Sequence, residues 1–467
     1  MLFNSVVFLF GFLPIAYVVF WSLRTTRWRH IWLALTGYVF YGYWNPWFAL
    51  LMLFSTLVSY SAGLGFLRWS DPRRRKLCLV VPVATDLALL GFFKYANFGL
   101  DTAEASLRLM GKNALLPRLN IVLPIGISFY TFHTISYIVD SYRGTIKPTR
   151  SFPKFAAYVS LFSQLVAGPI VRFRMLEADL ELLGGASRTR WLGRGVAFFV
   201  IGLVEKVIVA DSIAAFVDPA LAHYDLLSTT GTWLAMLGYS WQLYFDFAGY
   251  STMAVGLGLL FGLRIPQNFN SPYKAHDPSE FWRRWHISLS TCLRDYLYIP
   301  LGGNRHGELE TYRNMMLTML IGGLWHGASW TFVIWGGVSR CIAVAASRLR
   351  EAVGQTQRGR AAGGDVSARG VRMGALPVHH VRNGADHFSQ DVRAHDGRAG
   401  PATRSCGART RHCRVVGDDR SERVRDEPRA HAAEALRAHG GFRRVVGDYH
   451  RVAILALPLF PVLGGGA

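Results

Sequence analysis

The feature that most constrains the fold is a succession of long stretches without a charged residue. Residues 1–23 carry no charge, and neither do residues 31–67. A helix rises about 1.5 Å per residue, so about 20 apolar residues cross a hydrocarbon core of about 30 Å. Residues 31–67 are too long for one span, and the Asn-Pro pair in "YWNPW" at 43–47 predicts a turn that folds them into a hairpin.

Further apolar segments follow along the first two thirds of the chain. They run at about 77–97, 121–139, 155–171, 195–217, 231–263 and 315–339. Together these segments predict about nine or ten membrane spans. Several contain proline or glycine, as in "VLPIGISF", and broken helices are tolerated in a membrane only where they are buried in protein or line a cavity. The sequence therefore predicts an all-α, polytopic membrane helix bundle over residues 1–339, with an interior path.

Charge and composition support a multi-pass membrane protein. Hydrophobic residues make up 51% of the 467 residues, and the formal net charge is +21. The basic residues before residue 340 lie in short clusters between apolar runs, as in cytoplasmic loops that orient membrane helices. This pattern favours the lipid bilayer over nucleic acid as the partner. It predicts that loops 24–30, 68–76 and 264–313 are cytoplasmic.

His326 is the first candidate for chemistry. It lies in "IGGLWHGASWTFVIWGG" at 321–337, within a segment without formal charge. An ionisable residue inside a membrane span is costly and marks a functional site, and histidine exchanges protons near neutral pH. The alternative is structural, because Gly323 and Gly327 have the spacing of tight helix contacts. We favour a catalytic role.

The second candidate site is the segment "EFWRRWHISLSTCLRDYLYIPLGGNR", residues 280–305. At about 100° per residue, most of its aromatic and arginine side chains fall on opposite halves of one helix, which is typical of a helix at the membrane interface. Such a helix needs no catalytic histidine. Its position just before the His326 segment nevertheless predicts a joint site with His286 as a second catalytic residue. The residues expected to position the donor are Arg283, Arg284, Trp285, Arg294, Asp295 and Trp325.

Two polar residues in other apolar runs are weaker candidates for donor positioning. They are His133 in "SFYTFHTISYIVD" and Asp246 in "LYFDFAGYS". Either could instead be a structural polar group satisfied between helices. No Gly-x-Ser-x-Gly elbow, P-loop or zinc-ligand spacing occurs, so the sequence supports neither a metal site nor an ATP-driven pump.

Three segments together carry a family resemblance: "YFDFAGYSTMAVGLG", "FWRRWHISLSTCLRDYLYIPLGGNR" and "GGLWHGASWTFVIWGG". They resemble the signature segments of the membrane-bound O-acyltransferase family, and specifically its bacterial alginate O-acetyltransferase branch. The resemblance covers residues 1 to about 337. It implies that His326 is the catalytic histidine and that His286 is the family's second polar residue.

The resemblance implies acetyl transfer from a cytoplasmic thioester, acetyl-CoA or another acyl thioester, to an exopolysaccharide, most directly alginate. No bound cofactor is expected, because the thioester is a substrate. The expected partners are periplasmic polysaccharide acetylation proteins and the polysaccharide acceptor, and the expected location is the bacterial inner membrane. Two alternatives stay open. The acceptor could be cellulose, peptidoglycan or teichoic acid, or the protein could be a polysaccharide transporter without enzymatic activity.

The tail, residues 340–467, differs from everything before it. It is rich in arginine, glycine, alanine and histidine, it has no lysine, and "CGARTRHCRVVGDDRSERVRDEPRAHAAEALRAHGG" shows no lasting helical or strand period. A disordered basic tail is one interpretation. Because the family likeness ends abruptly, we favour translation out of frame after about codon 338, and we expect the chain as printed to be inactive or poorly stable.

Overall fold

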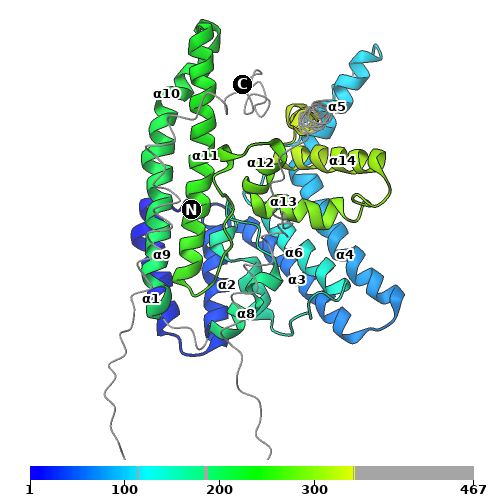
Figure 1. Ribbon diagram of the computed structural model, residues 1–467. Coiled ribbons are helices and arrows are strands. Elements are labelled where there is room, and N and C mark those ends of the chain that lie inside the picture. The colour runs from blue at the N-terminus through cyan, green and yellow to red at the C-terminus, as the bar shows by residue number, and fades with distance from the viewer. Residues whose placement is uncertain (113–114, 184–187, 340, 342–467) are drawn as a thin grey trace, which may run out of the picture. The chain divides into compact units, whose positions relative to one another are not determined.

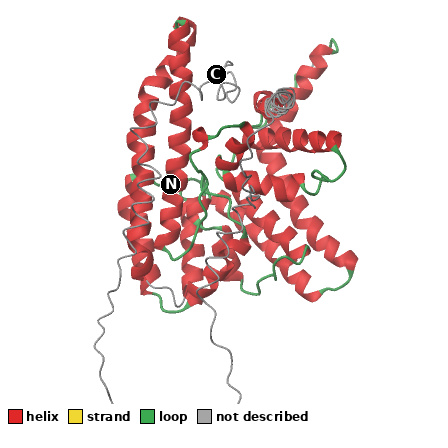
Figure 2. Ribbon diagram, in the orientation of Figure 1, coloured by secondary structure: helices red, strands yellow, loops and turns green. Residues whose placement is uncertain are grey.

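A computed structural model describes residues 1–112, 115–183, 188–339 and 341 of the chain. Within these residues every regular element is a helix, which confirms the all-α prediction (Figure 2). Apart from residue 341, the predicted tail lies outside the described residues, so its interpretation stays a prediction.

The helices alternate between long regular segments and short turns of π- or 3-10 helix, labelled η (Figure 1). The first half contains η1 (Val7–Phe12), α1 (Leu13–Ser22), α2 (Thr26–Gly42), α3 (Pro46–Arg68), α4 (Pro72–Leu90), η2 (Gly91–Tyr95), α5 (Ala96–Leu109), α6 (Ile127–Tyr142), α7 (Phe152–Val159), η3 (Phe162–Gln164) and α8 (Phe173–Leu182). The second half contains α9 (Arg188–Leu203), η5 (Val204–Ala210), α10 (Asp211–Ala222), η6 (Tyr224–Leu226), α11 (Thr229–Leu260), η7 (Pro272–Lys274), α12 (Pro278–Arg284), α13 (Ile287–Leu293), η8 (Arg294–Tyr298) and α14 (Glu308–His326).

The predicted hairpin in residues 31–67 is confirmed. Helix α2 ends at Gly42 and α3 begins at Pro46. Asn45 caps α3, because its side-chain oxygen accepts a hydrogen bond of 3.0 Å from the backbone N–H of Trp47. Proline suits the first helical turn, where its missing N–H would have no partner. The turn therefore follows from two adjacent residues.

Three helical segments are long and apolar enough to cross a membrane. They are Pro46–Arg68, Pro72–Leu109 and Thr229–Leu260, and Val7–Ser22 is a shorter apolar segment. The second of them continues from α4 through η2 into α5 without a break. The count of nine or ten spans is not confirmed and stays a prediction.

The predicted span at 155–171 is not one continuous helix. Helix α7 ends at Val159 and is followed by the short 3-10 turn η3. Eight helical residues rise only about 12 Å, too little for a hydrocarbon core. The side chains of Phe155, Tyr158 and Phe162 are fully buried. The segment therefore lies inside the protein, which is where a broken helix is tolerated.

Helices α9 and α11 pack closely because glycines line their contact (Figure 1). A Cβ atom at Gly256 of α11 would lie only 2.5 Å from the backbone nitrogen of Phe199 in α9, and a Cβ at Gly202 would lie 2.5 Å from the backbone nitrogen of Met253. Small residues let helix backbones approach in this way, the usual contact between membrane helices.

Candidate active site

His326 is the last residue of α14 and does not lie in the middle of a span. Gly327 follows with φ −153° and ψ 144°, an extended conformation that ends the helix. The chain becomes helical again over residues 330–339. The predicted continuous span at 315–339 is therefore broken, and His326 stands at the break.

The two arms of this apolar segment contact each other through glycines. A Cβ atom at Gly323 would clash with the carbonyl oxygen of Phe332, and one at Gly336 would clash with the carbonyl oxygen of Met319. The sequence had suggested that Gly323 packs against another helix, and its partner is the returning arm of the same segment. This close return explains why the apolar run does not continue as one helix.

Lys94 and Tyr95 bind the backbone end of α14. The Tyr95 hydroxyl donates to the carbonyl oxygen of Leu324 at 3.0 Å, and the Lys94 ammonium donates to the carbonyl oxygen of Trp325. The last carbonyls of a helix lack partners within the helix and carry partial negative charge, so a lysine there is favourable. Sequence reasoning missed both residues, although Lys94 is an ionisable residue inside the predicted span at 77–97.

The segment 280–305 is not the single helix that its periodicity predicts. Helix α12 ends at Arg284, α13 starts at Ile287, and between them His286 has φ 43° and ψ 54°. A non-glycine residue in this left-handed region is strained and persists only where its surroundings hold it. Here two backbone hydrogen bonds of 2.9 Å hold the turn: Ile287 donates to Asn268, and Asn270 donates to Arg284.

The His286 ring is buried beside His326. Its exposed fraction is 1%, and its centroid lies 6.4 Å from that of His326 and 4.8 Å from that of Phe247. The Nδ1 atom is 3.2 Å from the side-chain oxygen of Asn268. Burial lowers the pKa of His286 well below its ordinary value, and His326 lowers it further. The structure thus brings together the two histidines that the sequence selected.

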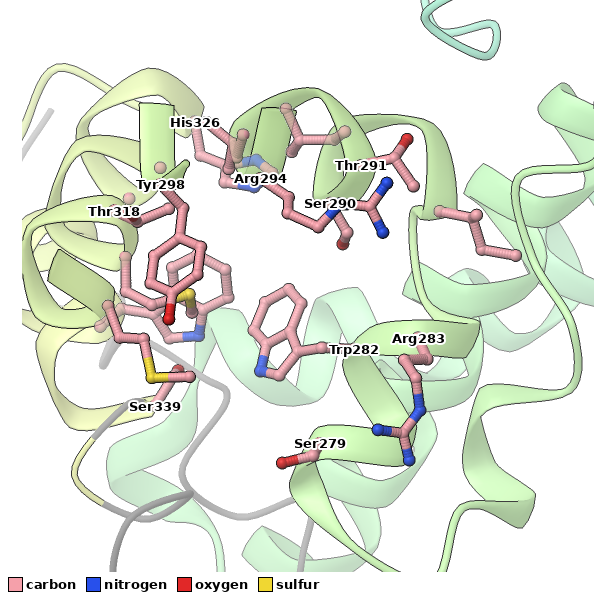
Figure 3. Close-up of a pocket in the computed structure, with 18 residues that line it drawn as sticks. Ser279, Trp282, Arg283, Ser290, Thr291, Arg294, Tyr298, Thr318, His326 and Ser339 are labelled. Atoms are coloured by element: carbon pink, nitrogen blue, oxygen red, sulfur yellow. The ribbon is translucent and has the colours of Figure 1, made fainter. Parts of the chain in front are cut away.

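A cavity of about 410 Å³ lies against His326 (Figure 3). Arg283 and Arg294 contribute positive charge to its wall, and the Trp282 indole projects into it from α12. The other lining residues are Ser279, Ile287, Leu289, Ser290, Thr291, Leu293, Tyr298, Met315, Thr318, Met319, Gly322, Gly323, Trp335 and Ser339. His286 does not line the cavity, although its ring centroid lies 6.4 Å from that of His326. The size and the mostly apolar wall suit a small organic substrate.

Two tryptophans hold the His326 ring from different sides. Its centroid lies 5.0 Å from the ring of Trp325 and 5.3 Å from that of Trp335. Trp325 also packs against Phe129 and Phe132 of α6 and does not line the cavity. Trp325 therefore links His326 to α6 outside the cavity wall, whereas Trp335, which sequence reasoning missed, lines the cavity.

Asp295 orients arginines and is not part of the cavity wall. It pairs with Arg172 at 2.6 Å and with Arg294 at 2.7 Å. Burial alone would raise the pKa of Asp295, but the hydrogen bonds from Arg294 and Arg172 outweigh it, so the pKa is lowered. An ionised Asp295 therefore fixes the position of Arg294 at the cavity.

Four other predicted residues do not line the cavity. Arg284 pairs with Glu280 at 2.7 Å, and Trp285 stacks on Phe281 at 5.5 Å. Asp246 pairs with Lys206 at 2.6 Å. His133 is fully buried, with its ring centroid 5.6 Å from that of Tyr158. For Arg284, Trp285 and Asp246 the structural interpretation fits the contacts better than donor positioning. Neither ring nitrogen of His133 has a hydrogen-bond partner among the described residues, so its role stays a prediction.

Comparison with known proteins identifies a family and several relatives of this chain. The model of the MBOAT, membrane-bound O-acyltransferase family, matches residues 146–353. A probable alginate O-acetylase of Azotobacter vinelandii is 47% identical over an alignment of 344 residues that covers 72% of this chain and 66% of that protein. A probable alginate O-acetylase of Pseudomonas putida is 48% identical over 72% of this chain and 68% of that protein.

A relative named for a different acceptor is also similar to this chain. The peptidoglycan O-acetyltransferase of Helicobacter pylori is 39% identical over an alignment of 365 residues that covers 72% of this chain and 68% of that protein. The chain thus spans about two thirds of the length of these curated relatives, between 66% and 68%.

Proposed function

The chain belongs to the membrane-bound O-acyltransferase family, and we propose that it moves an acetyl group from a cytoplasmic thioester towards the hydroxyl groups of an exopolysaccharide. The observation that carries the proposal is the position of His326, on the wall of a cavity that also contains Arg283 and Arg294. One group that can exchange a proton thus adjoins two that can bind an anionic substrate.

His326 acts as the general base of the transfer. A neutral imidazole at this position takes the proton of an attacking hydroxyl while the hydroxyl oxygen forms a bond to the thioester carbonyl carbon. The carbon–sulfur bond then breaks, and the leaving thiolate takes the proton back from His326. The side-chain hydrogen bonds from Lys94 and Tyr95 to the backbone carbonyl oxygens of Trp325 and Leu324 hold the end of α14 while the proton moves.

Arg283 and Arg294 bind the donor. A guanidinium presents several N–H donors in a fixed plane and suits phosphate oxygens, which a thioester such as acetyl-CoA carries. Asp295 and Arg172 keep Arg294 in place. The apolar part of the wall, with Leu293 and Met319, suits the uncharged arm that bears the thioester.

The acceptor we propose is alginate. The probable alginate O-acetylases share 47% and 48% identity with this chain, against 39% for the peptidoglycan O-acetyltransferase. Peptidoglycan is the second candidate acceptor, because that relative also matches 72% of the chain. Periplasmic acetylation proteins would take the acetyl group onward, and the long apolar helices would lie in the bacterial inner membrane.

Acetyl transfer in inner-membrane vesicles that also contain the expected periplasmic acetylation proteins tests the proposal. The full chain as printed and the chain with its reading frame restored after codon 338 are expressed separately, and both receive radiolabelled acetyl-CoA and deacetylated alginate or peptidoglycan. We expect labelled alginate from at least one version, and loss of the label in its His326→Ala variant. The matched control is His223→Ala, an exposed histidine at the end of α10.

Each negative result has a definite meaning. If neither version labels either polymer, the proposed activity is wrong. If His326→Ala labels the polymer as fast as the parent, the general base is wrong. If peptidoglycan is labelled and alginate is not, the acceptor is peptidoglycan and not alginate.

A further inference from the structure

Asn268 lies beneath the turn that carries His286. It is 2% exposed, and its backbone carbonyl oxygen accepts a hydrogen bond of 2.9 Å from the backbone N–H of Ile287. Its side-chain oxygen lies within hydrogen-bond distance of three atoms of the same turn: the backbone N of Ser288 at 3.1 Å, the Ser288 hydroxyl at 2.9 Å and the Nδ1 atom of His286 at 3.2 Å. One buried amide thus contacts the whole turn.

The chemistry of these partners fixes the direction of each hydrogen bond. A backbone N–H can only donate, so the amide atom beside Ser288 N must be the oxygen of Asn268. The other end of the amide, Nδ2, donates to the Ser251 hydroxyl of α11 at 3.3 Å. An amide oxygen can only accept, so the hydrogen between it and His286 must belong to Nδ1 of the imidazole.

The His286 ring carries a single proton in these surroundings. Its neighbours are Phe247 from α11, Phe269 from the preceding loop, and Trp325 and His326 from α14. Among these only His326 can carry charge, and a second positive charge beside it would be unfavourable. Burial and His326 both lower the pKa of His286, so the ring is neutral near pH 7. A neutral imidazole with its hydrogen on Nδ1 has a lone pair on Nε2.

We propose that Asn268 is a positioning residue that holds His286 as the Nδ1–H tautomer and leaves Nε2 as the proton acceptor of the ring. The part of this inference that concerns catalysis rests on the proposed function. In this tautomer, Nε2 accepts a hydrogen bond and cannot donate one while the ring is neutral. His286 therefore assists His326 as an acceptor and does not donate to the oxygen of a reacting carbonyl.

Nitrogen-15 NMR of histidine tests the tautomer without any assay of activity. The full chain is labelled with 15N-histidine and reconstituted in lipid bilayers, and the signals that disappear in His286→Gln belong to His286. We expect a protonated Nδ1 and an unprotonated Nε2. A protonated Nε2 in the wild-type chain would overturn the proposal, and this reading requires no folded Asn268 variant.

Variants of Asn268 test whether this residue sets the tautomer. Asn268→Leu removes the acceptor, and we expect the Nδ1–H form to give way to a mixture with the Nε2–H form. Asn268→Asp keeps an oxygen at the same place and should keep the Nδ1–H form. The control is Asn270→Leu, because Asn270 is exposed and contacts the turn through its backbone. An unchanged tautomer in Asn268→Leu would contradict the proposal.

Kinetics with whichever version of the chain transfers acetyl groups supply the second measurement. We expect Asn268→Leu to lower kcat at least about tenfold with KM nearly unchanged, because a wrong tautomer harms the reaction and not binding. Asn268→Asp should recover most of kcat, and Asn270→Leu all of it. A wild-type kcat in Asn268→Leu would refute the catalytic part. Failure of the wild-type chain to transfer acetyl would count against the proposed function alone, since the NMR result is independent of it.

Discussion

Helix α11 and the segment from α12 to residue 339 are both rich in aromatic residues and glycine, yet α11 is one continuous helix and the later segment is broken. Helix α11 continues from Thr229 to Leu260 without a break, and its glycines Gly249 and Gly256 face α9 and η5. The later segment breaks at His286 and again after His326. Glycine alone therefore does not end a helix. The breaks occur where polar groups from distant segments hydrogen-bond to the backbone, as Asn268 does at Ser288 and Lys94 does at Trp325. The cavity lies beside these breaks.

The largest effect is expected at the continuous helix. Gly256→Ala places a Cβ about 2.5 Å from the backbone nitrogen of Phe199, so the two helices must separate. We expect a loss of about 2–3 kcal/mol in the free energy of unfolding. Gly193→Ala is the control, because a Cβ there meets nothing within 4 Å. Denaturation of both variants in detergent checks this, and equal stability would show that α9 and α11 do not pack tightly.

A pH effect on stability is expected from the broken segment. The pKa of His286 is lowered in the folded protein, while the unfolded chain titrates near 6.5. The unfolded state therefore binds more protons below that pH, and the free energy of unfolding falls as pH decreases from 7 to 5. The slope is about 1.4 kcal/mol per pH unit for one such group. His286→Gln should flatten the curve, and an identical curve would mean that His286 is not buried as a neutral ring.

Lys94 allows a test of how the end of α14 is held. Lys94→Met removes the donor to the carbonyl oxygen of Trp325, and we expect kcat for acetyl transfer to fall about tenfold, because a misplaced His326 reacts poorly. Tyr95→Phe loses only a neutral hydrogen bond and should cost less. Lys147→Met, an exposed lysine after α6, is the control. An unchanged kcat in Lys94→Met would show that the hydrogen bond from Lys94 to Trp325 is not needed for catalysis.

The smallest effect distinguishes two arginines of one segment. Arg294→Gln should raise KM for the donor about fivefold, because Arg294 lines the cavity and binds the donor's phosphate in the proposed function. Arg284→Gln should leave KM unchanged, because Arg284 pairs with Glu280 outside the cavity. Steady-state kinetics with varied acetyl-CoA compare them. If the two substitutions raised KM equally, the donor would not bind in this cavity.

The sequence predicted the features that depend on neighbouring residues. The Asn45 cap with Pro46 is local, and the rule that ionisable residues in apolar runs are functional selected His326, with Arg283 and Arg294 nearby. The break at His286 depends on Asn268, 18 residues earlier, so helical periodicity predicted one continuous helix. Lys94 binds Trp325 across 231 residues of sequence. Such contacts between distant segments leave no periodic signal.

The central claim is that His326 and His286, placed by two separate breaks, act as one catalytic unit. A double-mutant cycle of acetyl transfer with His326→Ala, His286→Gln and the combined variant tests it most directly. We predict that His326→Ala lowers kcat at least about a hundredfold and that adding His286→Gln lowers it by less than about threefold more. If the two losses multiply in the combined variant, the histidines act independently, and the claim is contradicted.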